Sequence, residues 1–136
     1  INNVGTPQDI RYTAFLWRGR IQLRNSQFDA ASADFKEVIK KGGVDAAEAK
    51  WSIAKCHYGK GEYKKAESEI FALLEKYSAF EEWKYRGYLL LADVYMGLKD
   101  YFQARATIDA ILENVEVPWV VEEALIKKQE LDAMEN

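Results

Sequence analysis

One short pattern recurs three times along this chain and constrains its fold more than any other feature of the sequence. In each copy an aromatic residue stands shortly before an alanine, and the three alanines lie 35 and 38 residues apart. A bulky apolar residue follows each alanine after four positions and another after seven, while a small residue precedes it by twelve. A repeat of this length predicts a chain built by stacking copies of one structural unit. The three sets are Gly19, Phe28, Ala31, Phe35 and Val38; Ala54, Tyr63, Ala66, Ile70 and Leu73; and Ala92, Tyr101, Ala104, Ile108 and Ile111.

Each unit has the residue types of a pair of helices rather than of strands. No interval alternates between apolar and polar residues with a period of two, and helix-favouring Ala, Glu, Lys and Leu dominate the composition. Side chains able to accept a hydrogen bond from a helix N-terminus precede several intervals, and glycines follow several of them. The expected N-caps are Thr6, Ser26, Asp45, Ser78 and Asp100. We expect seven helices, at about residues 7–24, 27–41, 46–59, 62–77, 79–97, 101–114 and 118–134.

The pattern resembles the tetratricopeptide repeat, a helix-turn-helix unit of about 34 residues with small and aromatic residues in this order. The resemblance divides a single domain, residues 1–136, into repeats at about 12–45, 47–80 and 85–118 and a polar capping helix at 118–134. It implies an all-α fold, a right-handed superhelical α-solenoid of antiparallel helix pairs. We expect Ala92 to meet Ala104 where two helices cross, with Tyr95 and Tyr101 filling the space on either side.

Three departures from the family pattern carry expectations of their own. Arg18 and Gln22 stand where the repeat is normally apolar, which predicts a rotated first helix or a shifted turn in the first repeat. His57 occupies a slot that is normally tyrosine, and we expect it to pack there. The extra residues near Glu81 predict that the first helix of the third repeat is one turn longer than usual.

Few residues of the chain are suited to chemistry. Cys56 and His57 are the single cysteine and the single histidine, and neighbours on a helix point about 100° apart, so together they form neither a zinc site nor a catalytic dyad. The net charge of −3 does not suit a binder of nucleic-acid phosphates. No apolar run reaches the roughly 20 residues of a membrane span. We expect no catalytic residue, metal, cofactor, nucleic-acid partner or membrane insertion.

The resemblance implies that a protein or peptide binds the concave face, which the first helices of the repeats line. The expected contact residues are Leu16, Arg20, Trp51, Lys55, Tyr58, Arg86, Leu89, Asp93, Met96 and Trp119. We expect Trp51, Tyr58, Leu89 and Met96 to form one partly exposed patch, because exposed aromatic residues beside cations are typical of recognition surfaces. One branch of the family binds C-terminal carboxylates through a Lys/Asn clamp on this face. Its slots hold Leu16, Arg20, Ser52, Arg86 and Leu90 here and do not match.

The sequence therefore predicts a protein-interaction module, an adaptor or assembly scaffold, and leaves the partner open. One alternative is a purely structural segment that associates with itself through the apolar concave face or through an N-terminal face around Tyr12 and Phe15. An RNA-binding helical repeat and a small hydrolase or lyase on a helical scaffold are further alternatives. We expect the chain to be the C-terminal part of a longer bacterial protein of the cell envelope or periplasm.

Overall fold

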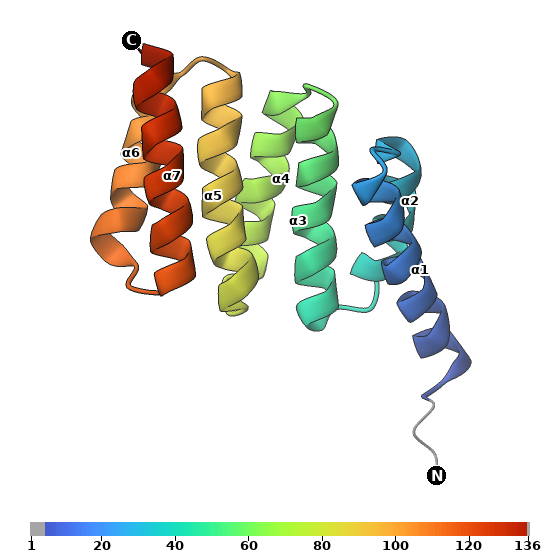
Figure 1. The fold of residues 1–136 in the computed structure, drawn as a ribbon. Coiled ribbons are helices and arrows are strands. Elements are labelled where there is room, and N and C mark those ends of the chain that lie inside the picture. The colour runs from blue at the N-terminus through green and yellow to red at the C-terminus, as the bar shows by residue number, and fades with distance from the viewer. Residues whose placement is uncertain (1–4, 136) are drawn as a thin grey trace.

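A computed structural model describes residues 5–135 of the chain (Figure 1). That part of the chain forms seven α-helices and no strand, which confirms the all-α prediction. Every expected helix is present, and the largest difference in a boundary is three residues, at the start of the third helix. The helices are α1 (Pro7–Arg24), α2 (Phe28–Ile39), α3 (Gly43–Gly59), α4 (Tyr63–Lys76), α5 (Glu81–Gly97), α6 (Tyr101–Asn114) and α7 (Pro118–Glu135).

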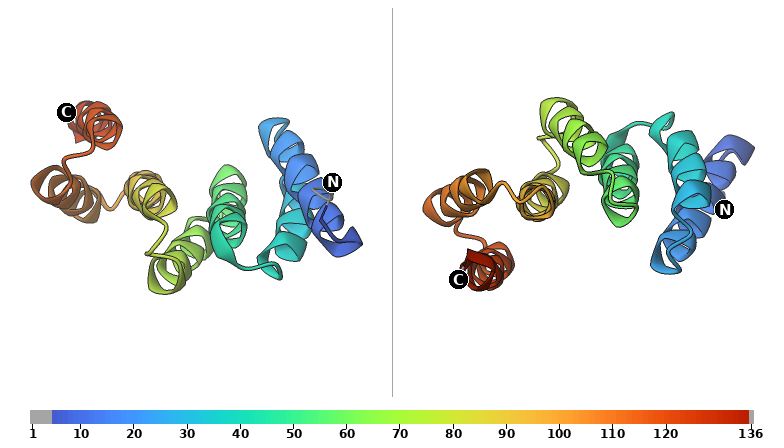
Figure 2. Two further views of the ribbon diagram at one scale, coloured as in Figure 1. Left: turned by 90° about the horizontal axis from the view of Figure 1, so that it is seen from below. Right: turned by 90° about the horizontal axis from the view of Figure 1, so that it is seen from above.

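The helices stand in two rows. The end-on views in Figure 2 place α1, α3, α5 and α7 in one row and α2, α4 and α6 in the other. Each helix packs on the next along the chain, and α1 also touches α3, α3 touches α5 and α5 touches α7. Within residues 5–135, the helices of the second row do not touch one another. Because helices are closer together in the odd-numbered row than in the even-numbered row, the stack curves toward the odd-numbered helices. The odd-numbered helices therefore line the inner face and the even-numbered helices the outer face.

Both alanines of the crossing expected in the third repeat lie in the core. Ala92 and Ala104 are fully buried in the same apolar cluster, and Tyr95 and Tyr101 pack in or against it. Small side chains at the crossing let the two helix backbones approach, and the aromatic rings fill the space beside it. Phe102, the second aromatic residue of that repeat, is 82% exposed and takes no part in the core.

The same aromatic positions also join each repeat to the next. The ring at the start of an outer helix packs onto the glycine that ends the following inner helix, Phe28 onto Gly59 and Tyr63 onto Gly97. A Cβ atom at Gly97 would lie 2.6 Å from Cε1 of Tyr63, and one at Gly59 would overlap the ring of Phe28. Both contacts therefore require glycine on sterics alone, although glycine inside a helix normally costs stability.

Side chains cap two of the helices as expected. The Thr6 hydroxyl accepts from the N–H of Asp9 at 3.1 Å, and the Asp9 carboxylate accepts in turn from the N–H of Thr6 at 3.2 Å. At the start of α6, the Asp100 carboxylate accepts from the N–H of Gln103 at 3.1 Å. These bonds satisfy N–H groups that have no partner within the helix.

The side-chain caps expected at Ser26, Asp45 and Ser78 are wrong, because α2, α3 and α5 begin after Gln27, Gly42 and Phe80. The backbone itself closes the turn within each repeat. The N–H groups of Gln27, Glu62 and Asp100 donate to the carbonyl five residues earlier at 2.8–2.9 Å. This arrangement needs a left-handed residue just before the donor, and Ser26, Gly61 and Lys99 supply it with φ of 60°, 76° and 60°.

The polar slots of the first repeat are accommodated by an ion pair. The guanidinium of Arg18 donates two hydrogen bonds to the carboxylate of Asp34, at 2.7 and 2.8 Å. That carboxylate side chain is 7% exposed, so it needs the partner. Gln22 keeps a buried side-chain oxygen that has no hydrogen-bond partner in the described part of the chain.

The extra residues of the third repeat do not lengthen its first helix, and that expectation is wrong. The helices α3 and α5 have 17 residues each. The extra length lies before α5 instead, because α4 has 14 residues where α2 has 12, and the connection 77–80 is one residue longer than the connection 40–42.

The last helix packs on α5 and α6 through Val120, Ala124 and Leu131, which are fully buried. Its free side is less polar than expected, since Leu125, Ile126 and Met134 are 44–51% exposed. None of the helices in residues 5–135 combines the length and the apolar character that crossing a membrane would require.

Replacing Gly97 with alanine should destabilise the protein. The new methyl group has to displace the Tyr63 ring, and we expect an overpacking cost of roughly 1–3 kcal/mol in the free energy of unfolding, measured by urea denaturation. Gly87→Ala is the matched control, because the nearest atom there is the flexible end of Leu73. Tyr63→Leu should recover stability in the Gly97→Ala background. Equal stability of Gly97→Ala and the wild type would contradict the proposed role of the ring.

Candidate interaction surface on the inner face

The inner face holds a shallow groove of about 280 Å³ where α3, α5 and α7 lie side by side. All three helices are first helices of a repeat or occupy that position in the stack, so their side chains face the same way. The groove combines indole rings with charged groups of both signs. Its lining residues are Trp51, Lys55, Arg86, Leu89, Leu90, Asp93, Trp119, Glu123 and Lys127.

Trp51 ties α3 to α5 at one end of this groove. Its indole Nε1–H donates to the backbone carbonyl of Arg86 at 3.1 Å. Its ring also packs against Trp83, with centroids 5.8 Å apart and planes tilted by 50°, which suits the quadrupoles of two aromatic rings. The indole packs against two of the core clusters and is partly buried. Trp51 therefore positions the groove and lines it as well.

Arg86 lies between two indole rings. Its guanidinium carbon is 5.4 Å from the centre of the Trp83 ring and 5.1 Å from that of Trp119, both within the range of a cation–π interaction. The guanidinium Nε also donates to Glu82 at 3.0 Å. Contacts on several sides hold the Arg86 side chain in place, and Trp119 extends the aromatic surface onto α7.

An ion pair joins α5 to α7 at the other end of the groove. The Lys127 ammonium donates to both oxygens of Asp93, at 2.9 and 2.8 Å, and both side chains are largely shielded from water. Lys55 differs, because its ammonium lies over the Tyr58 ring at 5.2 Å and makes no ion pair with any residue of 5–135. Lys55 is thus the cation of the groove that remains free for a ligand.

The structure brings six of the ten expected contact residues together in this groove: Trp51, Lys55, Arg86, Leu89, Asp93 and Trp119. The exposure expected for Leu89 and Met96 is wrong. Both are 6% exposed, because this side of α5 is covered by neighbouring helices. Tyr58 is partly buried beside Lys55 and packs against Tyr63, with ring centroids 5.6 Å apart.

The two expected residues on α1 lie outside the groove. Leu16 is buried in the cluster between α1, α2 and α3. Arg20 donates two hydrogen bonds of 2.6 Å to the carboxylate of Glu48 on α3, and its guanidinium carbon lies 4.9 Å from the centre of the Trp17 ring. Arg20 is therefore engaged within the chain.

Sequence reasoning missed Glu123, Lys127 and Trp83. The signal for the first two was present, since Trp119, Glu123 and Lys127 follow one another at four-residue intervals and so share one face of α7. Trp83 lies before the counted repeat positions, in the first turn of α5, so counting offsets along the repeat could not find it.

Comparison with known proteins agrees with this arrangement. Residues 16–81 match the sequence model of the tetratricopeptide repeat. This part of the chain belongs to the tetratricopeptide repeat family. In the crystal structure of the tetratricopeptide repeat domain of FLU from Arabidopsis, the fold is the same, with a TM-score of 0.68 at 21% identity over 80% of this chain and 98% of that one. No curated protein matches the sequence.

His57 contacts the turn of the second tetratricopeptide repeat. Its Nδ1 lies 2.8 Å from Oε1 of Glu62, across the turn that joins α3 and α4. His57 is also partly buried, and the packing role expected for it stays a prediction. Its neighbour Cys56 is fully buried. In residues 5–135 no three potential metal ligands gather.

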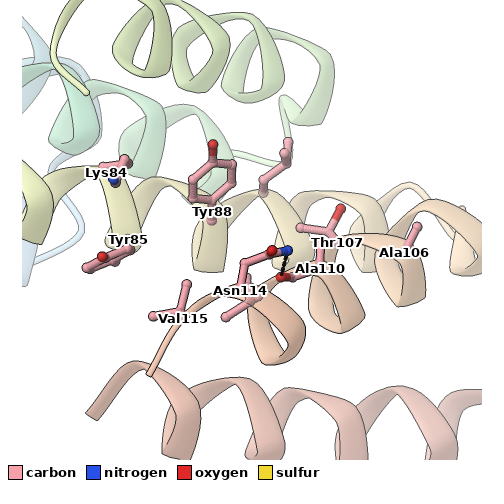
Figure 3. A pocket seen from close by; sticks show the side chains of 10 residues that line it. Lys84, Tyr85, Tyr88, Ala106, Thr107, Ala110, Asn114 and Val115 are labelled. Atoms are coloured by element: carbon pink, nitrogen blue, oxygen red, sulfur yellow. Dashed lines mark hydrogen bonds between the residues drawn. The ribbon is translucent and has the colours of Figure 1, made fainter. Parts of the chain in front are cut away.

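A second hollow, of about 520 Å³, lies on the opposite side of α5, against α6 (Figure 3). Tyr85 and Tyr88 of α5 line it together with the small residues Ala106 and Ala110 of α6. Figure 3 also shows the Asn114 amide, which donates to the Ala110 carbonyl at 2.8 Å and is thereby occupied. The hollow is larger than the inner groove but offers Lys84 as its single charged lining residue, so the inner groove is the better candidate for specific recognition.

Trp51→Phe should lower the stability of the protein while keeping its fold. The variant loses the bond to the Arg86 carbonyl, and we expect a loss of about 1 kcal/mol in urea denaturation. Trp119→Phe is the control, because the Trp119 indole N–H has no hydrogen-bond partner within residues 5–135. Equal losses in the two variants would show that the Trp51 bond contributes nothing measurable.

The turn between α3 and α4 should weaken in acid. The hydrogen bond from His57, followed by the charges of Lys60 and Lys65, lowers the pKa of Glu62 from its ordinary value of 4.5. A lowered carboxyl pKa stabilises the fold at pH above the ordinary value, and this contribution is lost as the pH falls through the lowered pKa.

We expect Glu62→Gln to lose less stability than the wild type on going from about pH 7 to about pH 3, as measured by thermal melts. Glu75→Gln, at an exposed position on α4, should follow the wild-type curve. If the stability of all three proteins falls equally between these pH values, the hydrogen bond between His57 and Glu62 does not stabilise the turn.

Proposed function

We propose that the inner face of this chain binds an extended segment of a partner protein, and that the groove between α3, α5 and α7 is its central contact. Tetratricopeptide repeats generally mediate protein–protein interaction and are a non-catalytic fold. The observation that carries the proposal is the gathering of Trp51, Arg86 and Trp119 in one groove, since Trp and Arg are enriched among the residues that dominate binding energy.

The apolar part of the groove favours a ligand with an aliphatic or aromatic side chain. Trp119 is 38% exposed, and the Trp51 ring beside it is held by its hydrogen bond to α5. Rings that are already fixed lose little conformational freedom when a ligand covers them. One apolar side chain fits the volume of about 280 Å³ with room for the adjacent backbone.

The charged part of the groove favours an acidic group near the apolar one. Asp93 is neutralised by Lys127, and Arg86 is paired with Glu82. Lys55 is then the cation available to a ligand carboxylate, while Glu123 at the opposite wall disfavours a second one. We therefore propose a segment in which one acidic residue lies close to an aliphatic or aromatic residue.

A peptide-display library selected against the purified protein would test this proposal. We expect the selected peptides to pair an apolar residue with Asp or Glu. Trp119→Ala should weaken their binding by about 2 kcal/mol, roughly 30-fold in Kd. Lys55→Glu should weaken acidic peptides more than apolar ones. These two substitutions are preferred to changes at Trp51 or Tyr58, which also pack against the core.

Phe102→Ala is the matched control for the test. Phe102 is 82% exposed on α6, in the outer row, so its loss should leave peptide binding unchanged. Thermal melts should show that all three variants remain folded. Selected peptides that bind Trp119→Ala and Lys55→Glu as tightly as the wild type would place the binding site elsewhere, and a library that yields no binder would contradict the proposal.

A further inference from the structure

One side of α1 carries an apolar stripe that is about half exposed within residues 5–135. Ile10, Ala14, Trp17 and Ile21 succeed one another at intervals of four, three and four residues, which places them in one row along the helix. Ile10 and Ile21 are each 50% exposed and Trp17 is 58% exposed, and Ala14 is exposed as well. The stripe differs from the face around Tyr12 and Phe15 that the sequence suggested, because Phe15 packs against the core.

The corresponding side of α3 shows what such a face does in this fold. Ala49, Ile53 and Cys56 stand on the side of α3 that meets α2, and all three are buried in one cluster with residues of that helix. The equivalent positions of α1 are Ala14, Arg18 and Ile21, so two of the three are apolar, and no helix of residues 5–135 other than α2 and α3 contacts α1. Within the described part of the chain, the stripe of α1 therefore resembles a helix-packing surface without a partner.

The spacing of the stripe makes it complementary to itself. An interval pattern of four, three and four residues reads the same in both directions. If two copies of α1 lie antiparallel about a two-fold axis, each Ile10 faces Ile21 of the second copy and each Ala14 faces Trp17 of the second copy. The largest side chain of the stripe then meets the smallest, twice, as in the interlocking of side chains between packed helices.

Four arginines of α1 lie beside the stripe. Arg18 is paired with Asp34 and Arg20 with Glu48, whereas the exposed Arg11 and Arg24 make no ion pair within residues 5–135. The approach of a second copy therefore rests on the apolar stripe and not on charge complementarity. Arg20 also stacks on one face of the Trp17 indole at 4.9 Å and holds the ring in place. An antiparallel arrangement further sets the two helix dipoles against each other favourably.

We infer that the stripe on α1 is a homodimer interface and that its partner is a second copy of this chain. An isologous contact of this kind uses the same surface patch on both subunits. The contact extends over one helix of 18 residues, about 27 Å at 1.5 Å per residue. Four partly exposed side chains per copy bury less area than a standard specific interface, so the dimer is reversible and dissociates on dilution. The interface is separate from the groove between α3, α5 and α7.

Sedimentation equilibrium over a wide range of protein concentration tests the inference. The weight-average molecular mass of the wild type should rise with protein concentration, from the 15.7 kDa of the monomer toward twice that value. Trp17→Asp, which places a charge in the centre of the stripe, should remain a monomer at every concentration. Phe102→Asp changes an even more exposed aromatic residue on α6 and should dimerise like the wild type.

Cysteine cross-linking tests the antiparallel register. In the inferred dimer the two copies of residue 10 are about 16 Å apart, too far for a disulfide, whereas residue 10 faces residue 21 of the other copy. A mixture of Ile10→Cys and Ile21→Cys should therefore form a disulfide-linked dimer on oxidation, and neither variant alone should do so. Each single variant also controls for Cys56, which is buried.

Three outcomes would overturn the inference. A wild type that stays monomeric at the highest concentration leaves the stripe to a helix of another protein or segment. Dimerisation of Trp17→Asp equal to that of the wild type places the interface elsewhere. Cross-linking of Ile10→Cys to itself, or none in the mixture, excludes the antiparallel two-fold register.

Discussion

Close approach of helix backbones is the constraint on which this fold depends. Two kinds of contact make it possible. Within a repeat, small residues such as Ala92 and Ala104 are buried in the cluster that the two helices share. Between repeats, an aromatic ring at the start of an outer helix lies directly on the glycine that ends the next inner helix, as Tyr63 does on Gly97. The small residue and the ring form one unit, because the ring occupies the volume that the missing side chain leaves.

This pairing explains why the sequence predicted so much of the fold. The small and aromatic positions stand at fixed distances in sequence because the geometry of the crossing fixes them, so the helix count and most boundaries could be read from the spacing. The helix caps were less predictable. Serine and aspartate favour several local structures, and at Ser26 the backbone closure of the turn requires a left-handed residue instead of a cap.

The inner groove was only partly predictable for a different reason. Repeat offsets show which side chains point inward, and six of the ten expected residues do meet in the groove. They do not show how far a neighbouring helix covers a side chain, and this is why Leu89 and Met96 are buried despite their inward positions. Pairing partners are equally hidden, because the bond between Asp93 and Lys127 joins residues 34 positions apart.

The separation of the outer helices has a consequence for the shape of the molecule. Because α2, α4 and α6 do not touch one another within the described part of the chain, a change in curvature breaks no contact in that row. The inner row is held from helix to helix by side chains, among them Trp51 against Arg86 and Arg86 against Trp119. A segment that wedges between these side chains would flatten the arc, and one that clasps them would tighten it. The distance between the two ends of the stack would then report on what occupies its middle.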